Sequence, residues 1–362
     1  MVTAYQFFNA RKPGKVGPDW QQVRENLELK PSRSISMNWY GIIKCSQKEA
    51  QIPKTILGKT NLEVGRLGLG TWELGDQKTD PDDVTEIIQY MLDHGGNLID
   101  TADCYSDAEG ILGKALKDIN RDDYILVTKA GHVPENNKDF KHEKKEDIEF
   151  SKKVIKKNVE ISLKKLKTDH IDVLLIHTST LEKLHEGEVI DAVIEAQKDG
   201  KVRFIGYSGD NEEIIYASQI PEFSVVEMSM NITDMKNRGL PLKSVKEQNL
   251  GVLVKRPIAN AFWRGSDIYK KAYEYAEDYR YRAKKMSLNN KDYLEAAIGF
   301  TMATPVDVLA IGTTRLDHMK ENIDIASSVP RWDRKFNSII SSFENAEKDE
   351  NYTDKRDWLG LD

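Results

Sequence analysis

Four polar residues of this 362-residue chain could together transfer a proton: Asp100, Tyr105, Lys129 and His177. Asp100, Lys129 and His177 each end a short apolar run, and Tyr105 follows Asp100 after a few residues. Each residue alone has an ordinary explanation, because an Asp at a strand end often caps a helix and a Lys there often faces solvent. Their convergence at neighbouring run ends is what indicates a catalytic site.

This combination of side chains suits the reduction of a carbonyl group. Hydride attack on a carbonyl carbon places negative charge on the oxygen, which must then be protonated. A tyrosine has an unperturbed pKa of about 10, so we expect the ammonium of Lys129 to lower the pKa of Tyr105, with Asp100 keeping Lys129 in place and charged. His177 can donate a hydrogen bond to the developing alkoxide. The sequence therefore predicts Tyr105 as the general acid.

The elements that must position these residues are visible as eight short apolar runs that alternate with longer amphipathic segments. Several runs are apolar at consecutive positions, which is typical of parallel strands covered on both faces. The alternation predicts an α/β fold, a closed (β/α)8 TIM barrel, in which catalytic groups come from the C-terminal ends of the strands. An open nucleotide-binding sheet is disfavoured because the chain has no G-x-G-x-x-G turn. The expected strands are 67–70, 97–101, 124–128, 171–176, 204–207, 225–228, 252–254 and 306–311.

The remaining segments define the expected helices and the domain plan. Segment 55–64 predicts a β-hairpin that caps the barrel, with turn residues at Gly58 and Asn61. We expect an N-terminal extension over 1–50, the barrel over 51–330, and a C-terminal helix and tail over 331–362 that pack on the barrel. The expected helices are 82–94, 108–118, 149–166, 187–199, 212–219, 241–248, 269–281 with 292–303, and 316–327.

Composition excludes several classes of protein. The net charge of −6, from 53 basic and 59 acidic residues, argues against nucleic acid as a partner. The two cysteines cannot form a disulfide framework, and no apolar run is long enough to span a membrane, so we expect a cytoplasmic protein with no membrane partner. The histidines show no metal-ligand spacing, and we predict no metal. Oligomeric state stays open.

Three segments resemble known motifs. The run from Asp100 to Gly113, DTADCYSDAEGILG, resembles the signature of the aldo-keto reductase family around its catalytic Asp and Tyr. The runs ending at Lys129 (VTK) and His177 (LIH) resemble the segments that hold the family's Lys and His. The resemblance extends over 55–326. It implies an NAD(P)H-dependent reductase of small aldehydes or ketones.

The resemblance also implies a nicotinamide site at the barrel mouth, partly with unusual residues. Gly209 stands where the pattern has an Asn, Glu227 where it has a carboxamide-binding Gln, and Lys255 where an aromatic ring often stacks on the nicotinamide. A carboxylate at 227 can accept a hydrogen bond from the carboxamide but cannot donate one. The contacts implied on this side are Gly70, Thr71, Trp72, Ser208, Gly209, Glu227, Lys255 and Arg256.

A last segment, 311–322, resembles the part of the family that grips the adenosine 2′-phosphate at a helix N-terminus. Arg315 offers a guanidinium, whereas His318 stands at the next basic position of the pattern and is a weaker phosphate partner. We therefore expect NADP as the cofactor, with NAD possible. The contacts implied on this side are Gly312, Thr313, Thr314, Arg315, His318, Glu321 and Asn322.

Two other functions are compatible with these residues. A regulatory subunit that binds a nicotinamide nucleotide with little turnover could keep the same four residues, and the extension 1–50 could be its interaction arm. A barrel lyase or isomerase could instead use Lys129 as a Schiff-base nucleophile, but Tyr105 and His177 would then have no role.

Overall fold

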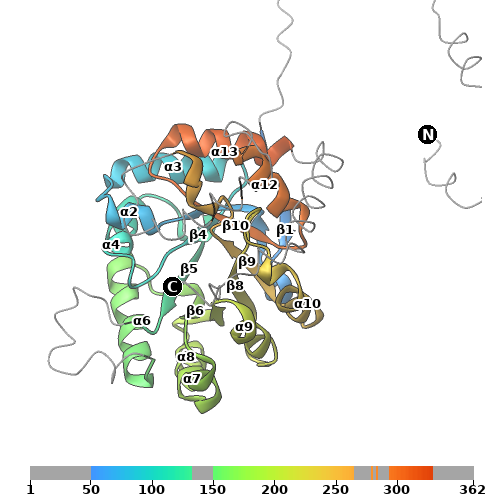
Figure 1. Ribbon diagram of the computed structural model, residues 1–362. Helices are drawn as coiled ribbons and strands as arrows, with labels where there is room; N and C mark the ends of the chain where they lie inside the picture. Colours follow the sequence, from blue (N-terminus) through green and yellow to red (C-terminus); the bar gives the residue numbers. More distant parts are fainter. Residues whose placement is uncertain (1–49, 133–149, 265–278, 280–282, 284–292, 329–362) are drawn as a thin grey trace, which may run out of the picture. The chain divides into compact units, whose positions relative to one another are not determined.

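The structure is a computed structural model that describes residues 50–132, 150–264, 279, 283 and 293–328. Its centre is a closed barrel of parallel strands in the order β10-β3-β4-β5-β6-β7-β8-β9 (Figure 1). The strands are β3 (Leu67–Gly70), β4 (Leu98–Asp100), β5 (Ile125–Ala130), β6 (Ile171–His177), β7 (Val202–Ser208), β8 (Val225–Ser229), β9 (Gly251–Lys255) and β10 (Val308–Gly312). The predicted TIM barrel is confirmed.

Helices surround this barrel and turn their apolar faces towards it. In α3 the side chain of Asp80 accepts a hydrogen bond from the backbone N–H of Asp82, and Pro81 begins the helix, so the N-terminus is well capped. The helices are α2 (Trp72–Asp76), α3 (Pro81–Asp93), α4 (Ala108–Ala115), α6 (Lys152–Leu166), α7 (Leu181–Glu186), α8 (Glu188–Lys198), α9 (Asn211–Ser218), α10 (Leu240–Glu247), α12 (Tyr293–Ala303) and α13 (Leu316–Ser328). Short 3-10 turns are η1 (Gly58–Thr60), η2 (Arg121–Asp123), η3 (Lys236–Arg238) and η4 (Ala259–Arg264).

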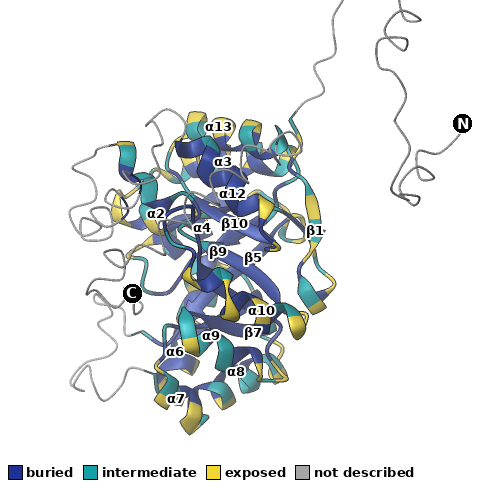
Figure 2. Cartoon of the chain, turned by 45° about the vertical axis from the view of Figure 1, so that its right-hand side comes forward, coloured by how far each residue is buried: buried dark blue, intermediate teal, exposed yellow. Residues whose placement is uncertain are grey.

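Burial is greatest in the barrel strands, and exposed positions lie on the outer sides of the helices and on the hairpin strand β1 (Figure 2). The core has two layers because side chains alternate along each strand. In β6, Leu174 and Ile176 belong to the large cluster that includes the helices, whereas Val173 and Leu175 belong to a second cluster inside the barrel. Position parity in a strand therefore decides whether a residue faces the barrel interior.

A hairpin closes one end of this interior. Its strands β1 (Lys54–Ile56) and β2 (Glu63–Gly65) are antiparallel, as the sequence predicted. Leu57 and Val64 join the inner cluster, and Gly58 lies against the first residue of β9, Gly251. The hairpin thus covers the amino ends of the strands, which leaves the carboxyl ends for a site.

The structure differs from the predicted elements in a few places. Helices α2 and α7 were not predicted, because helices of five and six residues show little periodicity. Strand β5 continues past Thr128 to Ala130, so Lys129 lies within the strand. The extension 1–50 lies outside the described residues apart from Ala50, as do the tail 331–362 and almost all of the expected helix 269–281. Within the described part, no helix is long and apolar enough to cross a bilayer.

Candidate active site

Strand alternation places the predicted catalytic residues inside the barrel. Leu98 and Val127 belong to the inner cluster, and Asp100 and Lys129 each follow two positions later on the same face. His177 follows the inner residues of β6 in the same way. The strands are in parallel register, so these side chains form one layer above the apolar interior. The sequence prediction that the three residues converge agrees with this geometry.

Lys129 is the centre of the layer and is fully buried. Its Nζ donates to Oδ1 of Asp100 at 2.6 Å and to the carbonyl oxygen of Thr101 at 3.0 Å. A second carboxylate, Oε2 of Glu227 on β8, lies 3.3 Å from Nζ. Glu227 is itself fully buried, and the hydroxyl of Ser208 donates to the same Oε2 at 2.7 Å. One ammonium is therefore held between two carboxyl groups, which we call the buried triad: Asp100, Lys129 and Glu227.

The pKa values of the buried triad reflect this crowding. Burial alone would lower the pKa of Lys129, but Asp100 and Glu227 reverse that effect and raise it well above its usual value. Burial and the neighbouring Glu227 raise the pKa of Asp100 to about 8, despite the opposing effect of Lys129. Burial would also raise the pKa of Glu227, but Lys129 and Lys255 lower it overall. Near neutral pH, Asp100 is therefore the carboxyl group of the triad that carries a proton, and Glu227 is ionised.

Tyr105 follows β4 and lies beside the triad. Nζ of Lys129 is 5.1 Å from the centroid of its ring, and the ring of His177 is 6.0 Å away, edge to face. Burial raises the pKa of Tyr105 above its ordinary value, and this effect exceeds the lowering by Lys129. The expectation of a lowered pKa for Tyr105 was therefore wrong, because desolvation destabilises the phenolate more than the charge of Lys129 stabilises it. Tyr105 stays protonated, which is the form that an acid needs.

His177 is held by a neighbour of Tyr105. Sγ of Cys104 lies 3.4 Å from Nδ1 of His177, and the ring of His132 packs against that of His177 at 4.7 Å. Burial, followed by His132 and Lys129, lowers the pKa of His177 well below its usual value, so the imidazole is neutral. Among the described residues Nε2 of His177 has no hydrogen-bond partner. A thiol that donates to Nδ1 leaves the proton on Nε2, ready for a substrate oxygen.

Asp103, Cys104 and His177 bring potential metal ligands within 4.8 Å of one another. Burial raises the pKa values of the Asp103 carboxyl and the Cys104 thiol, which favours their protonated, non-ligating forms. The absence of a resident metal remains a prediction.

Several residues predicted to contact the nicotinamide are bound to protein groups. The hydroxyl of Thr71 donates to the carbonyl oxygen of Asp100 at 2.9 Å, and the N–H of Gly209 donates to the carbonyl oxygen of Glu227 at 3.1 Å. A Cβ at Gly209 would lie 2.5 Å from the ring of Tyr207, so a side chain at this position would require that ring to shift.

Lys255 and Arg256 form the next part of the mouth. Nζ of Lys255 lies 3.5 Å from Oδ2 of Asp210, and a guanidinium N–H of Arg256 donates to the hydroxyl of Ser229 at 3.2 Å. Asp210 also accepts from the backbone N–H of Ser229 at 2.7 Å. These cations are anchored to β8 and the loop after β7. Trp72 is exposed.

One orphaned atom indicates room for a polar ligand on this side. Oε1 of Glu227 is buried and has no hydrogen-bond partner among the described residues. A buried acceptor without a donor is costly. The NH₂ group of a carboxamide would supply that donor, so the residues present fit a nicotinamide at this place.

The predicted phosphate segment has a different character. It surrounds the start of α13, where the guanidinium of Arg315 pairs with Asp317 at 2.5 Å and both side chains are largely exposed. Nε2 of His318 is 2.8 Å from Nη1 of Arg264, and Arg264 also pairs with Glu321 at 3.0 Å. Arg315 and Arg264 are thus already next to an acid or an imidazole.

The other predicted residues of this segment mostly stabilise its backbone. The hydroxyl of Thr313 accepts from the N–H of Arg315 at 3.1 Å, as in a helix cap, and the hydroxyl of Thr314 donates to Gln77 at 3.2 Å. Asn322 is buried. A Cβ at Gly312 would lie 2.0 Å from a carboxylate oxygen of Glu73, so an acid borders this glycine.

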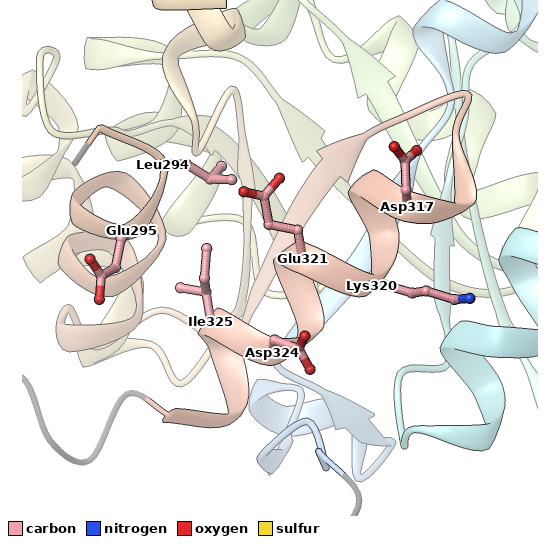
Figure 3. Close-up of a pocket in the computed structure, with 7 residues that line it drawn as sticks. All are labelled: Leu294, Glu295, Asp317, Lys320, Glu321, Asp324 and Ile325. Atoms are coloured by element: carbon pink, nitrogen blue, oxygen red, sulfur yellow. The ribbon is translucent and has the colours of Figure 1, made fainter. Parts of the chain in front are cut away.

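A hollow of about 500 Å³ lies between α12 and α13 (Figure 3). Its lining is mostly acidic: Glu295, Asp317, Glu321 and Asp324, together with Lys320, Leu294 and Ile325. Four carboxylates and one ammonium would repel a phosphate. Glu321 faces Leu294 in this hollow (Figure 3). The hollow is not the candidate active site.

Sequence reasoning missed three contacts. Glu227 was predicted only as a carboxamide ligand; in the structure it faces the barrel interior, two positions after Val225 of the inner cluster, and reaches Lys129. Cys104 was interpreted as a packing residue, and nothing in the sequence pairs it with His177. Arg264 comes from the loop after β9, and no pattern predicts that it reaches His318 and Glu321.

Comparisons with known proteins agree with this geometry. A family model described as "Aldo/keto reductase family" matches residues 66–343. "Aldo-keto reductase YhdN" of Bacillus subtilis (strain 168) is 30% identical over 251 residues, which cover 67% of this chain and 73% of that protein. "NADH-specific methylglyoxal reductase" of Escherichia coli (strain K12) is 30% identical over 229 residues, which cover 59% of this chain and 69% of that protein.

A solved structure is also similar. The "aldo-keto reductase AKR11C1 from Bacillus halodurans (holo form)" superposes with a TM-score of 0.65 at 27% identity, covering 81% of this chain and 96% of that one. Fold, motifs and relatives point to the same conclusion. The chain belongs to the aldo-keto reductase family of oxidoreductases.

Proposed function

We propose that this protein reduces the carbonyl group of small aldehydes or ketones with NAD(P)H, and that Tyr105 is the general acid. The observation that carries the proposal is the buried triad beside Tyr105 and His177. The bound nicotinamide supplies the hydride. Tyr105 donates its phenolic proton to the substrate oxygen, and the charge of Lys129 stabilises the tyrosinate that remains.

His177 orients the substrate in this proposal. A neutral imidazole that is protonated at Nε2 donates to the carbonyl oxygen, and that hydrogen bond strengthens as charge develops on the oxygen. The mouth residues around Glu227, Lys255 and Gly70 bind the nicotinamide half of the cofactor. Asn322 and the segment 312–315 bind the adenosine half, where Arg315 and Arg264 favour NADP over NAD because a guanidinium pairs well with a phosphate.

A Schiff-base role for Lys129 is not supported. An amine nucleophile must be deprotonated. Lys129 is held between two carboxyl groups that raise its pKa well above the ordinary value. We therefore do not propose a lyase or isomerase.

Nucleotide titration followed by a carbonyl panel tests the function. The quenching of tryptophan fluorescence by NADPH and by NADH gives both Kd values, and the tighter nucleotide is then used with aliphatic, aromatic and sugar aldehydes. Sustained turnover with at least one carbonyl is expected. Binding followed by a single turnover only, across the whole panel, would identify a regulatory nucleotide-binding subunit instead, and no binding of either nucleotide would refute both functions.

A further inference from the structure

The carboxyl group of Glu227 lies between Lys129 and the proposed place of the nicotinamide. Its Oε2 is 3.3 Å from Nζ of Lys129 and accepts from Ser208, while Oε1 is buried without a partner. One oxygen of this carboxyl group therefore contacts Lys129, the cation beside Tyr105, and the other oxygen can still accept a hydrogen bond. An amide at this position would be neutral, so the chain carries one more ionisable acid here than a single lysine requires.

Because two carboxyl groups contact one ammonium, we expect one of the two to keep its proton near neutral pH. Asp100 and Glu227 share one buried ammonium, and two carboxylates so close to each other in a buried site cannot both ionise easily. Repulsion from Glu227 adds to burial in raising the pKa of Asp100 to about 8, despite the opposing effect of Lys129. At pH 7 the triad then holds Lys129 as a cation, Glu227 as an anion and Asp100 as a neutral acid.

We propose, on the basis of the proposed function, that this proton is released to solvent when the positively charged, oxidised nicotinamide binds, and is kept when the neutral, reduced nicotinamide binds. Glu227 is the positioning residue for this effect. It links the side of the site that binds nucleotide to the side that transfers the proton.

The sign follows from charge. A cation close to the two carboxyl groups favours their ionised forms and lowers the pKa of the pair, so the proton on Asp100 leaves. By linkage, the affinity for the oxidised nucleotide must then rise with pH through the pKa of the free pair, by at most about tenfold per pH unit. The reduced nucleotide has a neutral ring and shows no such rise from this source.

Other titratable and charged groups near the triad come from each neighbouring element. They include Asp103, Cys104 and Tyr105 after β4, His132 after β5, His177 on β6, Asp210 after β7, and Lys255 and Arg256 on and after β9. The pKa values of Tyr105 and Cys104 lie far above neutrality and that of His177 well below it. Burial and the neighbouring Glu109 also raise the pKa of Asp103 well above its usual value, so a variant at Glu227, which leaves Asp103 in place, is needed to assign the proton to the Asp100–Glu227 pair.

Calorimetry measures the proton directly. The full chain is titrated at pH 7 with the oxidised and the reduced form of the tighter nucleotide, in buffers of different ionisation enthalpy, to count protons released. The phosphates are common to both forms, so their titration cancels in the difference. We expect the oxidised form to release about half to one proton more than the reduced form, which is the release that linkage predicts for a group of pKa about 8.

Two variants assign the proton. Glu227→Gln is expected to abolish the difference, because Asp100 then faces Lys129 alone. Glu109→Gln is the matched control: Glu109 is a buried acid that accepts from Thr128 and makes no ion pair with Lys129, and the difference should persist. Should Glu227→Gln fail to fold, the pH dependence of the two Kd values in the unsubstituted protein still tests the release: a Kd ratio of oxidised to reduced nucleotide that does not change with pH overturns the inference.

The outcomes separate this inference from the proposed function. Equal proton release by the two forms, or an unchanged difference in Glu227→Gln, overturns the inference while nucleotide binding and turnover stand. Failure of both forms to bind overturns the proposed function and the inference together.

Discussion

The two halves of the proposed site are built in opposite ways. The proton-transfer half consists of side chains on packed strands, with Lys129 fully buried between Asp100 and Glu227. The adenosine half lies at the start of α13, where Arg315 and Asp317 are exposed and pair with each other. The first half is held together by buried ion pairs of the protein itself, whereas in the proposed complex the second half would exchange the pair of Arg315 and Asp317 for a phosphate.

This difference follows from the free-energy cost of an unpaired charge, which is large in the protein interior and small at the surface. A buried charge must be paired at all times, since leaving it alone costs several kcal/mol. An exposed charge is screened by water and ions, and its pairing contributes little. Removing the buried cation of the first half should therefore affect both folding and chemistry, and removing an exposed cation of the second half should affect nucleotide choice alone.

The largest difference between the halves should come from removing one cation in each. Lys129→Met leaves two carboxyl groups buried without a counter-charge, so we expect a loss of about 3–5 kcal/mol in the free energy of unfolding and no detectable turnover. The loss should shrink at low pH, because protonation then neutralises Glu227 as well as Asp100. Arg315→Met is the matched variant and should unfold at the same denaturant concentration as the unsubstituted protein. Similar destabilisation by both variants would contradict the comparison.

The sharing of Lys129 predicts strong coupling between its partners. Asp100→Asn and Glu227→Gln each leave one carboxyl group on the ammonium, so each alone should change stability little. The double variant leaves a buried cation without an anion and should cost at least about 1 kcal/mol more than the sum of the single changes. Urea unfolding of the four proteins measures this coupling. Additive effects would mean that Lys129 does not depend on both acids.

The contact between Cys104 and His177 predicts a smaller effect within the buried half. Cys104→Ala removes the donor to Nδ1 and should lower kcat about threefold to tenfold, as expected for one neutral hydrogen bond. Cys104→Ser retains a donor and should recover most of the loss. Equal rates for the two variants would show that Cys104 only fills space.

The smallest effect is expected at the rim. Asp317→Asn frees Arg315 for a phosphate, so the Kd for NADPH should fall about twofold to threefold at low salt, whereas the Kd for NADH should not change. The gain should disappear at high ionic strength. Fluorescence titrations at two salt concentrations are sufficient, and an equal gain for NADH would place Arg315 away from the 2′-phosphate.

The sequence predicted the first half well for a physical reason. Apolar runs mark the strands, and catalytic groups of a closed barrel lie at the carboxyl ends of its strands, so the sequence indicated that Asp100, Lys129 and His177 converge. What it missed depends on distances across the barrel: Glu227 reaches Lys129 from the opposite side, and burial outweighs Lys129 in setting the pKa of Tyr105. These are tertiary effects that no local pattern contains.

The second half was harder to predict. The motif from Gly312 to Asn322 gives residue types but not their partners, and exposed side chains such as Arg315 and His318 pair with whichever acid or base lies nearby. The cofactor contacts of both halves therefore remain proposals.

The most direct measurement is hydride transfer in Tyr105→Phe. Rapid mixing of the NADPH-bound protein with a carbonyl substrate follows nucleotide oxidation in one turnover, and fluorescence gives the Kd for NADPH. We expect the rate to fall at least about 100-fold, as for loss of a general acid, while the Kd changes less than about twofold because the phenol is not a proposed nucleotide contact. A rate close to that of the unsubstituted protein would contradict Tyr105 as the proton donor.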